Sequence, residues 1–156
     1  MRVREAMTPN PITIDPQAPV GTAVAVMRER SLRHLPVVDD RGQLLGIVTD
    51  RDLRSVMLAP AIDEYADAAE RDRLRALAGE LDDIRVSHVM TWGALTTGPD
   101  AMVAQAAAVM ADARVGSLPV VQGQRLVGIV TERDVLRALG TTLPSVRGTD
   151  PDAYLR

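Results

Sequence analysis

The chain has 156 residues, 46% of them apolar and 25% charged, which suits one globular domain or two small lobes and excludes a disordered or fibrous protein. Cysteine is absent and His34 and His88 are the only histidines, so disulfides are excluded and we expect no metal site. The absence of cysteine fits a reducing compartment, so we expect a cytoplasmic protein. The net charge is −3 at pH 7 with no lysine and no long apolar run, so we expect it to bind neither nucleic acid nor membrane.

The first predicted elements are a short strand and a helix. Residues 11–14 form a brief β-prone run that stops at the Asp15-Pro16 pair. Pro19 is a favourable first residue for a helix, because its missing N–H would have no partner there. Apolar residues then recur at helical spacing, which predicts an amphipathic helix over residues 19–30.

A β-hairpin and a second helix are predicted next. Two apolar runs, Leu35–Val38 and Leu44–Val48, are separated by a polar turn that contains a glycine, which is typical of a hairpin. Thr49 and Asp50 follow the second run, and their side chains can cap a helix over residues 51–58. The first part of the chain is therefore predicted to mix strands and helices.

The same order of elements returns in the second half of the chain. When the sequence is shifted by 83 residues, Val3–Val38 aligns with Val86–Val121 without a gap, and 15 of the 36 positions are identical. The shift falls to 82 after the predicted hairpin turn, where a change of length is tolerated. We therefore predict a first copy over residues 1–58 and a second over residues 86–140. Neither copy is large enough to close a core alone, so the two are predicted to pack together.

Two segments have no counterpart elsewhere in the chain. Residues 59–85 begin near Pro60, carry acidic residues early and arginines later, and have a narrow apolar stripe. This composition predicts a helical linker that lies on the module, or alternatively a contact with a partner. Residues 141–156 contain prolines and a glycine and are predicted to be a flexible tail.

The repeated motifs resemble those of a known family. Each copy has Leu-Pro-Val-Val, then a hairpin turn, then Gly-Ile-Val-Thr-Asp/Glu-Arg-Asp, at residues 46–52 and 128–134. This doubled pattern resembles the tandem CBS (cystathionine-β-synthase) domains of Bateman modules, and the long insertion is similar to that of small stand-alone proteins of the acetoin-utilisation type. The resemblance implies an α+β fold of two pseudo-symmetric repeats, each β-α-β-β-α, packed as one module with a helical insertion.

The resemblance also implies adenosine ligands in two clefts between the copies. Asp52 and Asp134 would accept ribose hydroxyls, while Thr49 and Thr131 would face phosphate together with helix N-terminal amides. In the family each cleft mixes the copies. One cleft is expected to combine Ile47, Thr49, Arg51 and Asp52 with Leu95, Val115 and Gly116, and the other Ile129, Thr131, Arg133 and Asp134 with Ile12, Leu32 and Arg33. The expected ligand is AMP, ADP or ATP, with NAD, S-adenosylmethionine or a cyclic dinucleotide left open.

The copies differ just before the first hairpin strand. Arg33 and His34 in the first copy correspond to Gly116 and Ser117 in the second. These positions border the clefts in the family, so the two clefts are expected to differ in charge. Placing Arg33 in the cleft of Asp134 makes that cleft the expected phosphate site.

Three functional interpretations stay open, and no catalytic residue is predicted. The first is a regulatory module, a homodimer as is common in the family, that senses adenine nucleotides and signals to an unknown protein partner. The second is an assembly module with empty clefts, in which Thr49 and Asp52 only cap a helix. The third is a small enzyme, which is disfavoured because no nucleophile–base pair repeats and no Gly-x-x-x-x-Gly-Lys loop is present.

Overall fold

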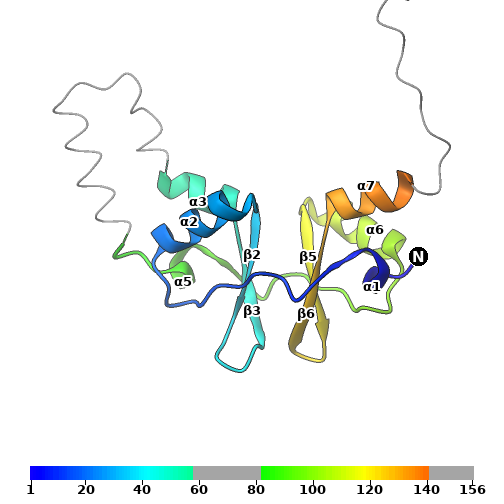
Figure 1. Cartoon of the computed structure of the whole chain (residues 1–156), viewed down its shortest axis with the longest axis horizontal. Coiled ribbons are helices and arrows are strands. Elements are labelled where there is room, and N and C mark those ends of the chain that lie inside the picture. The colour runs from blue at the N-terminus through cyan, green and yellow to red at the C-terminus, as the bar shows by residue number, and fades with distance from the viewer. Residues whose placement is uncertain (58–81, 141–156) are drawn as a thin grey trace, which may run out of the picture.

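The computed structural model of the chain describes residues 1–57 and 82–140, which form two lobes with the same order of elements (Figure 1). The predicted tail over residues 141–156 lies outside these ranges, as does most of the predicted linker helix over residues 59–85. Within the described ranges, no helix is long and apolar enough to cross a membrane.

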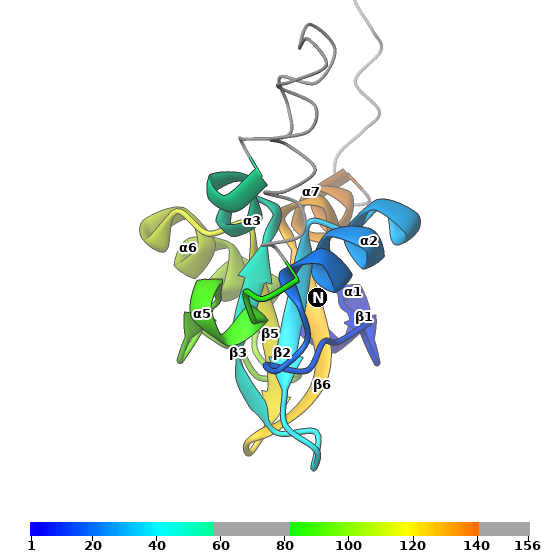
Figure 2. The same ribbon diagram turned by 90° about the vertical axis from the view of Figure 1, so that its left-hand side faces the viewer.

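The lobes repeat one order of helices and strands, as the internal alignment predicts. The first copy supplies α1 (Val3–Ala6), β1 (Thr8–Pro9), α2 (Val20–Arg30), β2 (His34–Val38), β3 (Leu44–Thr49) and α3 (Asp50–Met57). The second copy supplies α5 (Val86–Val89), β4 (Thr91–Trp92), α6 (Val103–Ala113), β5 (Ser117–Gln122), β6 (Arg125–Thr131) and α7 (Glu132–Gly140). The sheets lie at the centre of the molecule, with the helices on the outer sides and the hairpin turns together at one end (Figures 1 and 2).

The two copies exchange their first strands. The sheets have the orders β2-β3-β4 and β1-β6-β5, so β4 of the second copy completes the sheet of the first, and β1 of the first completes the sheet of the second. Thr91 pairs with Ile47 in one sheet, and Thr8 pairs with Ile129 in the other. Each lobe is therefore built from both halves of the sequence.

Glycines at the start of the repeated motif allow this exchange. A Cβ on Gly46 would lie 2.6 Å from Cε of Met90 and closer still to the carbonyl oxygen of Thr91, in the exchanged strand. A Cβ on Gly128 would similarly meet the Met7 side chain. The glycine of the motif is thus required for the close approach of a neighbouring strand.

Each lobe has its own apolar core, and each core contains residues from both copies. In one core Val86 and Met90 of the second copy pack with residues of the first, such as Leu35 and Val48. In the other, Val3 of the first copy packs among second-copy residues. The prediction that neither copy closes a core alone is confirmed in this specific form.

The local predictions hold for the hairpins and need correction elsewhere. The run over residues 11–14 is not a strand, because only Ile14 pairs, in a single bridge to Val37. Prolines near both ends of this run interrupt the pattern of N–H donors that a longer strand needs. Pro19 is the N-cap of α2 and not its first helical residue, and the next helix begins at Asp50.

Candidate functional site

A pocket of about 660 Å³ lies between the two copies beside the N-terminus of α3. We call it the Asp52 pocket. All seven residues of the cleft that the family resemblance predicts around Asp52 line it: Ile47, Thr49, Arg51, Asp52, Leu95, Val115 and Gly116. Arg33, His34 and Ser117 line it as well. The sequence therefore identified residues that the fold brings together, and their role as ligand contacts stays a prediction.

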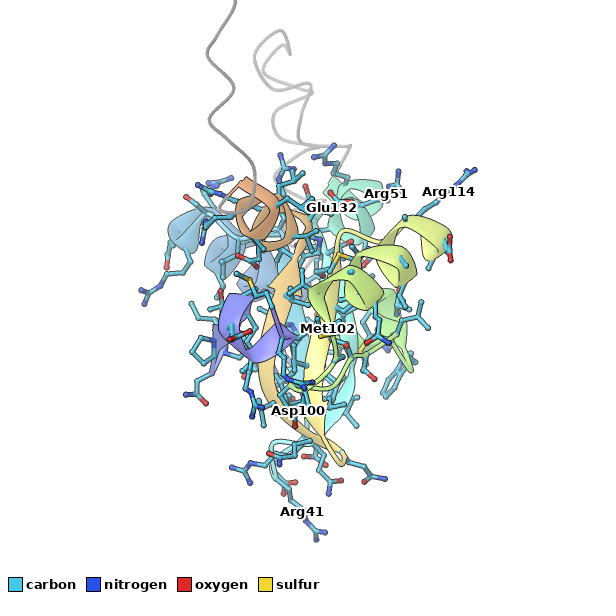
Figure 3. The ribbon with its side chains drawn as sticks, turned by 90° about the vertical axis from the view of Figure 1, so that its right-hand side faces the viewer. Arg41, Arg51, Asp100, Met102, Arg114 and Glu132 are labelled. Carbon is cyan, nitrogen blue, oxygen red and sulfur yellow. The ribbon has the colours of Figure 1, made fainter. Side chains whose placement is uncertain are left out.

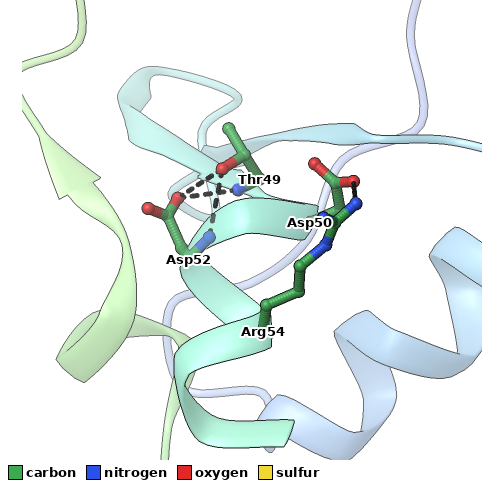
Figure 4. Close-up of polar contacts among 4 residues, drawn as sticks. All are labelled: Thr49, Asp50, Asp52 and Arg54. Atoms are coloured by element: carbon green, nitrogen blue, oxygen red, sulfur yellow. Dashed lines mark hydrogen bonds and ion pairs between the residues drawn. The ribbon is translucent and has the colours of Figure 1, made fainter. Parts of the chain in front are cut away.

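The strand-to-helix junction at β3 and α3 holds Asp52 in a fixed orientation (Figure 4). Oδ2 of Asp52 accepts hydrogen bonds from the backbone N–H of Thr49 at 2.8 Å and from its hydroxyl at 2.9 Å. The hydroxyl oxygen of Thr49 in turn accepts the N–H of Asp52 at 3.3 Å. These bonds cap the helix, as the simplest interpretation of the motif predicts, and they also orient the carboxylate at the pocket.

The second copy repeats this junction in a more buried setting. Oδ2 of Asp134 accepts the N–H and the hydroxyl of Thr131 at 2.9 and 2.7 Å. Asp134 is only 8% exposed, and its Oδ1 lies 3.8 Å from the guanidinium of Arg137. The two aspartates of the motif are thus alike in their bonds to threonine and different in their access to solvent.

The remaining predicted residues do not line the Asp52 pocket. These are the residues assigned to the second cleft: Ile12, Leu32, Ile129, Thr131, Arg133 and Asp134. Ile12 is exposed and Ile129 is buried. Their grouping into a second ligand site stays a prediction.

Arg33 differs from the sequence expectation, since it lines the Asp52 pocket. The hairpin explains this position, because His34 pairs with Thr49 across β2 and β3. The carbonyl of Arg33 also accepts the N–H of Asp50 at 2.9 Å. Residues 33 and 34 are therefore fixed beside the N-terminus of α3, next to Asp52.

The side chain of His34, in the first copy, lies against Gly116 of the second copy. A Cβ on Gly116 would lie 3.2 Å from Nε2 of His34, so the small residue makes room for the imidazole. Burial lowers the pKa of His34, and the positive charge of Arg33 lowers it further; the carboxylates of Asp50, Glu132 and Asp52 act in the opposite direction. Because burial is the largest effect, the pKa of His34 lies below its ordinary value.

The pocket also contains residues that sequence reasoning missed: Asp50, Thr91, Gly93, Ala94, Ala113, Arg114, Pro119 and Glu132. Arg114 is the most consequential of these, because it adds a third arginine. It lies at the same end of the molecule as Arg51 and Glu132 (Figure 3). Its counterpart in the first copy is Ser31, so a comparison of motif positions gave no signal for it.

Comparisons with known proteins decide the family. A family model described as CBS domain matches residues 3–59 and 86–141. The chain belongs to the CBS domain family. A CBS domain-containing protein of Dictyostelium discoideum is 34% identical over 145 residues, which are 92% of this chain and 94% of that protein. Hypoxic response protein 1 of Mycobacterium tuberculosis is 30% identical over 136 residues, 87% of this chain and 83% of that protein.

Other relatives are much longer than this CBS pair. The chain spans 31% of an uncharacterized protein of Methanocaldococcus jannaschii and 24% of homoserine O-acetyltransferase of Methanococcoides burtonii. In that enzyme the CBS match is a minor part of the protein. The prediction that the chain is not an enzyme agrees with this distribution.

Solved structures of CBS pairs share the fold. CBSX2 of Arabidopsis thaliana in complex with AMP has a TM-score of 0.72 at 27% identity, covering 90% of this chain and 97% of that one. The CBS pair of protein MJ0100 with 5′-methylthioadenosine and S-adenosyl-L-methionine has a TM-score of 0.71 at 26% identity, covering 92% and 98%. A putative acetoin utilization protein, AcuB, from Vibrio cholerae has a TM-score of 0.70 at 27% identity, covering 91% and 92%. The predicted α+β fold of two CBS repeats is confirmed.

Proposed function

We propose that this CBS pair binds an adenosine nucleotide in the Asp52 pocket and regulates a partner protein in response. The observation that carries the proposal is the grouping of apolar side chains, the oriented Asp52 carboxylate and a helix N-terminus around one cavity. The complexes of CBSX2 with AMP and of MJ0100 with methylthioadenosine and S-adenosylmethionine support adenosine as the shared part of the ligand. AMP, ADP and ATP are the first candidates.

Each part of the nucleotide has a matching group in the pocket. Ile47, Leu95 and Val115 offer apolar surface to the adenine ring. The carboxylate of Asp52 accepts hydrogen bonds from the ribose hydroxyls, because an ionised carboxylate acts only as an acceptor. The N-terminal amides of α3 and the guanidinium of Arg51 suit a phosphate.

Regulation follows from the position of the pocket between the copies. Arg51 and Asp52 belong to the first copy, whereas Leu95 and Val115 belong to the second. A ligand that contacts both sides favours the lobe arrangement it fits best, so its binding free energy can shift that arrangement. A partner that contacts α3 or α7 would detect the shift.

We also propose that the module is a homodimer that uses the helices α2, α3, α6 and α7. Leu136 and Leu139 on α7 are 68% and 51% exposed, and Val109 on α6 is 38% exposed. Large apolar side chains on neighbouring helices favour burial against a second copy.

A thermal-shift screen tests the proposed function against an assembly module with empty clefts. AMP, ADP, ATP, NAD, S-adenosylmethionine and a cyclic dinucleotide are added separately to the purified protein. A ligand at 100 times its Kd raises the free energy of unfolding by about 2.7 kcal/mol, which moves the melting temperature clearly. If none of these compounds raises the melting temperature or binds in calorimetry, the assembly module is favoured.

A further inference from the structure

Three arginines from separate segments line the Asp52 pocket. Arg33 precedes β2, Arg51 lies in the first turn of α3, and Arg114 ends α6 in the second copy. Between residues that the structure describes, no ion pair or side-chain hydrogen bond involves any of these guanidiniums. All three residues are exposed, and the Arg114 side chain extends outward from the end of α6 (Figure 3), so each guanidinium can turn toward an anion in the pocket.

The acidic groups of the pocket compensate this charge only in part. Asp50 is paired with Arg54 of the same helix, at 2.9 Å between Oδ2 and the guanidinium. Asp52 accepts hydrogen bonds from the uncharged Thr49 and keeps its negative charge at the pocket. Glu132, at the start of α7, is the third carboxylate of the lining and lies at the same end of the molecule as Arg114 (Figure 3). Asp52 and Glu132 therefore oppose the three arginines with two negative charges.

The helix end at Arg114 does not require the arginine side chain. Arg114 is the C-cap of α6 and has a φ of +55°, in the left-handed region. Glycine and asparagine are favoured at such helix ends, because a Cβ is crowded there. The helix end would therefore form more easily without an arginine, and its backbone N–H, not its side chain, makes the capping bonds to Met110 and Ala111.

We infer that Arg114 makes the Asp52 pocket select phosphorylated adenosine ligands over uncharged ones. This inference rests on the proposed function, because it assumes that adenosine occupies the pocket. A phosphate at the N-terminus of α3 would form ion pairs with Arg51 of the first copy and Arg114 of the second, so the anion would link the two copies. An uncharged ligand such as 5′-methylthioadenosine keeps the base and ribose contacts and gains nothing from either guanidinium.

The test replaces Arg114 by glycine and compares two ligands by calorimetry at low ionic strength. Arg114→Gly is expected to weaken AMP binding by about tenfold, the order expected for one charge-assisted hydrogen bond, and to leave methylthioadenosine binding unchanged. Its melting temperature should stay the same or rise, because glycine suits the left-handed backbone. A purely structural role for the side chain would instead lower the melting temperature and affect both ligands.

Two further variants control for backbone and charge. Ser31→Gly makes the same backbone change at the matching helix end of α2, where φ is +53°, without removing a charge, and should alter neither ligand's affinity. Glu132→Gln removes the opposing charge and should strengthen AMP binding several-fold, with no change for methylthioadenosine. Salt should reduce the difference between wild type and Arg114→Gly.

The outcomes separate the inference from the proposed function. If wild type binds both ligands and Arg114→Gly changes the two affinities equally, or changes neither affinity, the selectivity assigned to Arg114 is wrong while the adenosine site stands. If wild type binds neither ligand, nor any other adenosine compound, the proposed function fails and this inference fails with it.

Discussion

Replacing Gly46 by alanine tests whether the exchange of edge strands holds the Asp52 pocket together. The added Cβ would lie 2.6 Å from Met90 Cε and closer still to the backbone oxygen of Thr91, whereas ordinary contacts of this kind lie at 3.4–4 Å. Strand β4 must therefore move away from β3 by roughly 1 Å, which strains its hydrogen bonds. Overpacking costs about 1–3 kcal/mol and a lost hydrogen bond about 1 kcal/mol, so Gly46→Ala should lower the free energy of unfolding by about 3 kcal/mol.

Urea unfolding followed by circular dichroism measures this loss against two graded controls. A Cβ on Gly98 meets nothing within 4 Å, so Gly98→Ala should stay within about 0.5 kcal/mol of wild type. Gly128→Ala should fall between the two, because its closest contact is the movable side chain of Met7. Gly46→Ala should also weaken AMP binding, since β4 leads directly into Gly93 and Leu95 of the pocket. If Gly46→Ala is as stable as Gly98→Ala, the strand exchange does not have the role assigned to it.

Three further predictions concern protonation, occupancy and assembly. Burial lowers the pKa of His34, and a bound phosphate should raise it. AMP affinity should therefore be greatest when the pH is below the His34 pKa of the free protein. It should fall as the pH rises through the His34 pKa of the complex. Calorimetry in buffers of different ionisation enthalpy should detect proton uptake that His34→Gln removes; equal uptake in both proteins would contradict this. Trp92 is the single tryptophan and lies between the pocket residues Thr91 and Gly93, so AMP should change its fluorescence, and Asp52→Asn should abolish the change at the same AMP concentration. Light scattering should give about twice the chain mass of 16.8 kDa, and Leu136→Glu should halve it; a wild-type mass of 16.8 kDa would contradict the dimer.

Sequence reasoning could predict the hairpins because the repeat doubles each signal, and it could group residues of the Asp52 pocket because the motifs resemble those of a known family. Leu35–Val38 and its copy are short apolar runs beside turns, and the structure confirms both hairpins. The residues grouped with Asp52 also line one pocket. That grouping came from resemblance to a family, since spacing in one chain does not reveal which residues of another copy lie opposite.

Other features depend on tertiary contacts that leave little trace in local sequence. The edge strands β1 and β4 have two residues each and exist only because β6 and β3 offer them partners. Arg33 was assigned to the cleft of Asp134 and lines the Asp52 pocket, because its carbonyl bond to Asp50 depends on the hairpin register. Arg114 was missed because it has no counterpart arginine in the first copy, and its position becomes meaningful only once α6 faces α3 across the pocket.

The binding of AMP to wild type and to Asp52→Asn, measured by calorimetry, tests the central proposal most directly. Asparagine preserves the size of the side chain and an acceptor oxygen for Thr49, so circular dichroism should show a folded protein. The loss of a charged acceptor for the ribose should weaken AMP binding by about 10- to 100-fold. The matched variant Asp134→Asn, at the more buried aspartate, should leave binding in the Asp52 pocket intact. Equal AMP affinity in wild type and Asp52→Asn would contradict the assignment of this pocket as the nucleotide site.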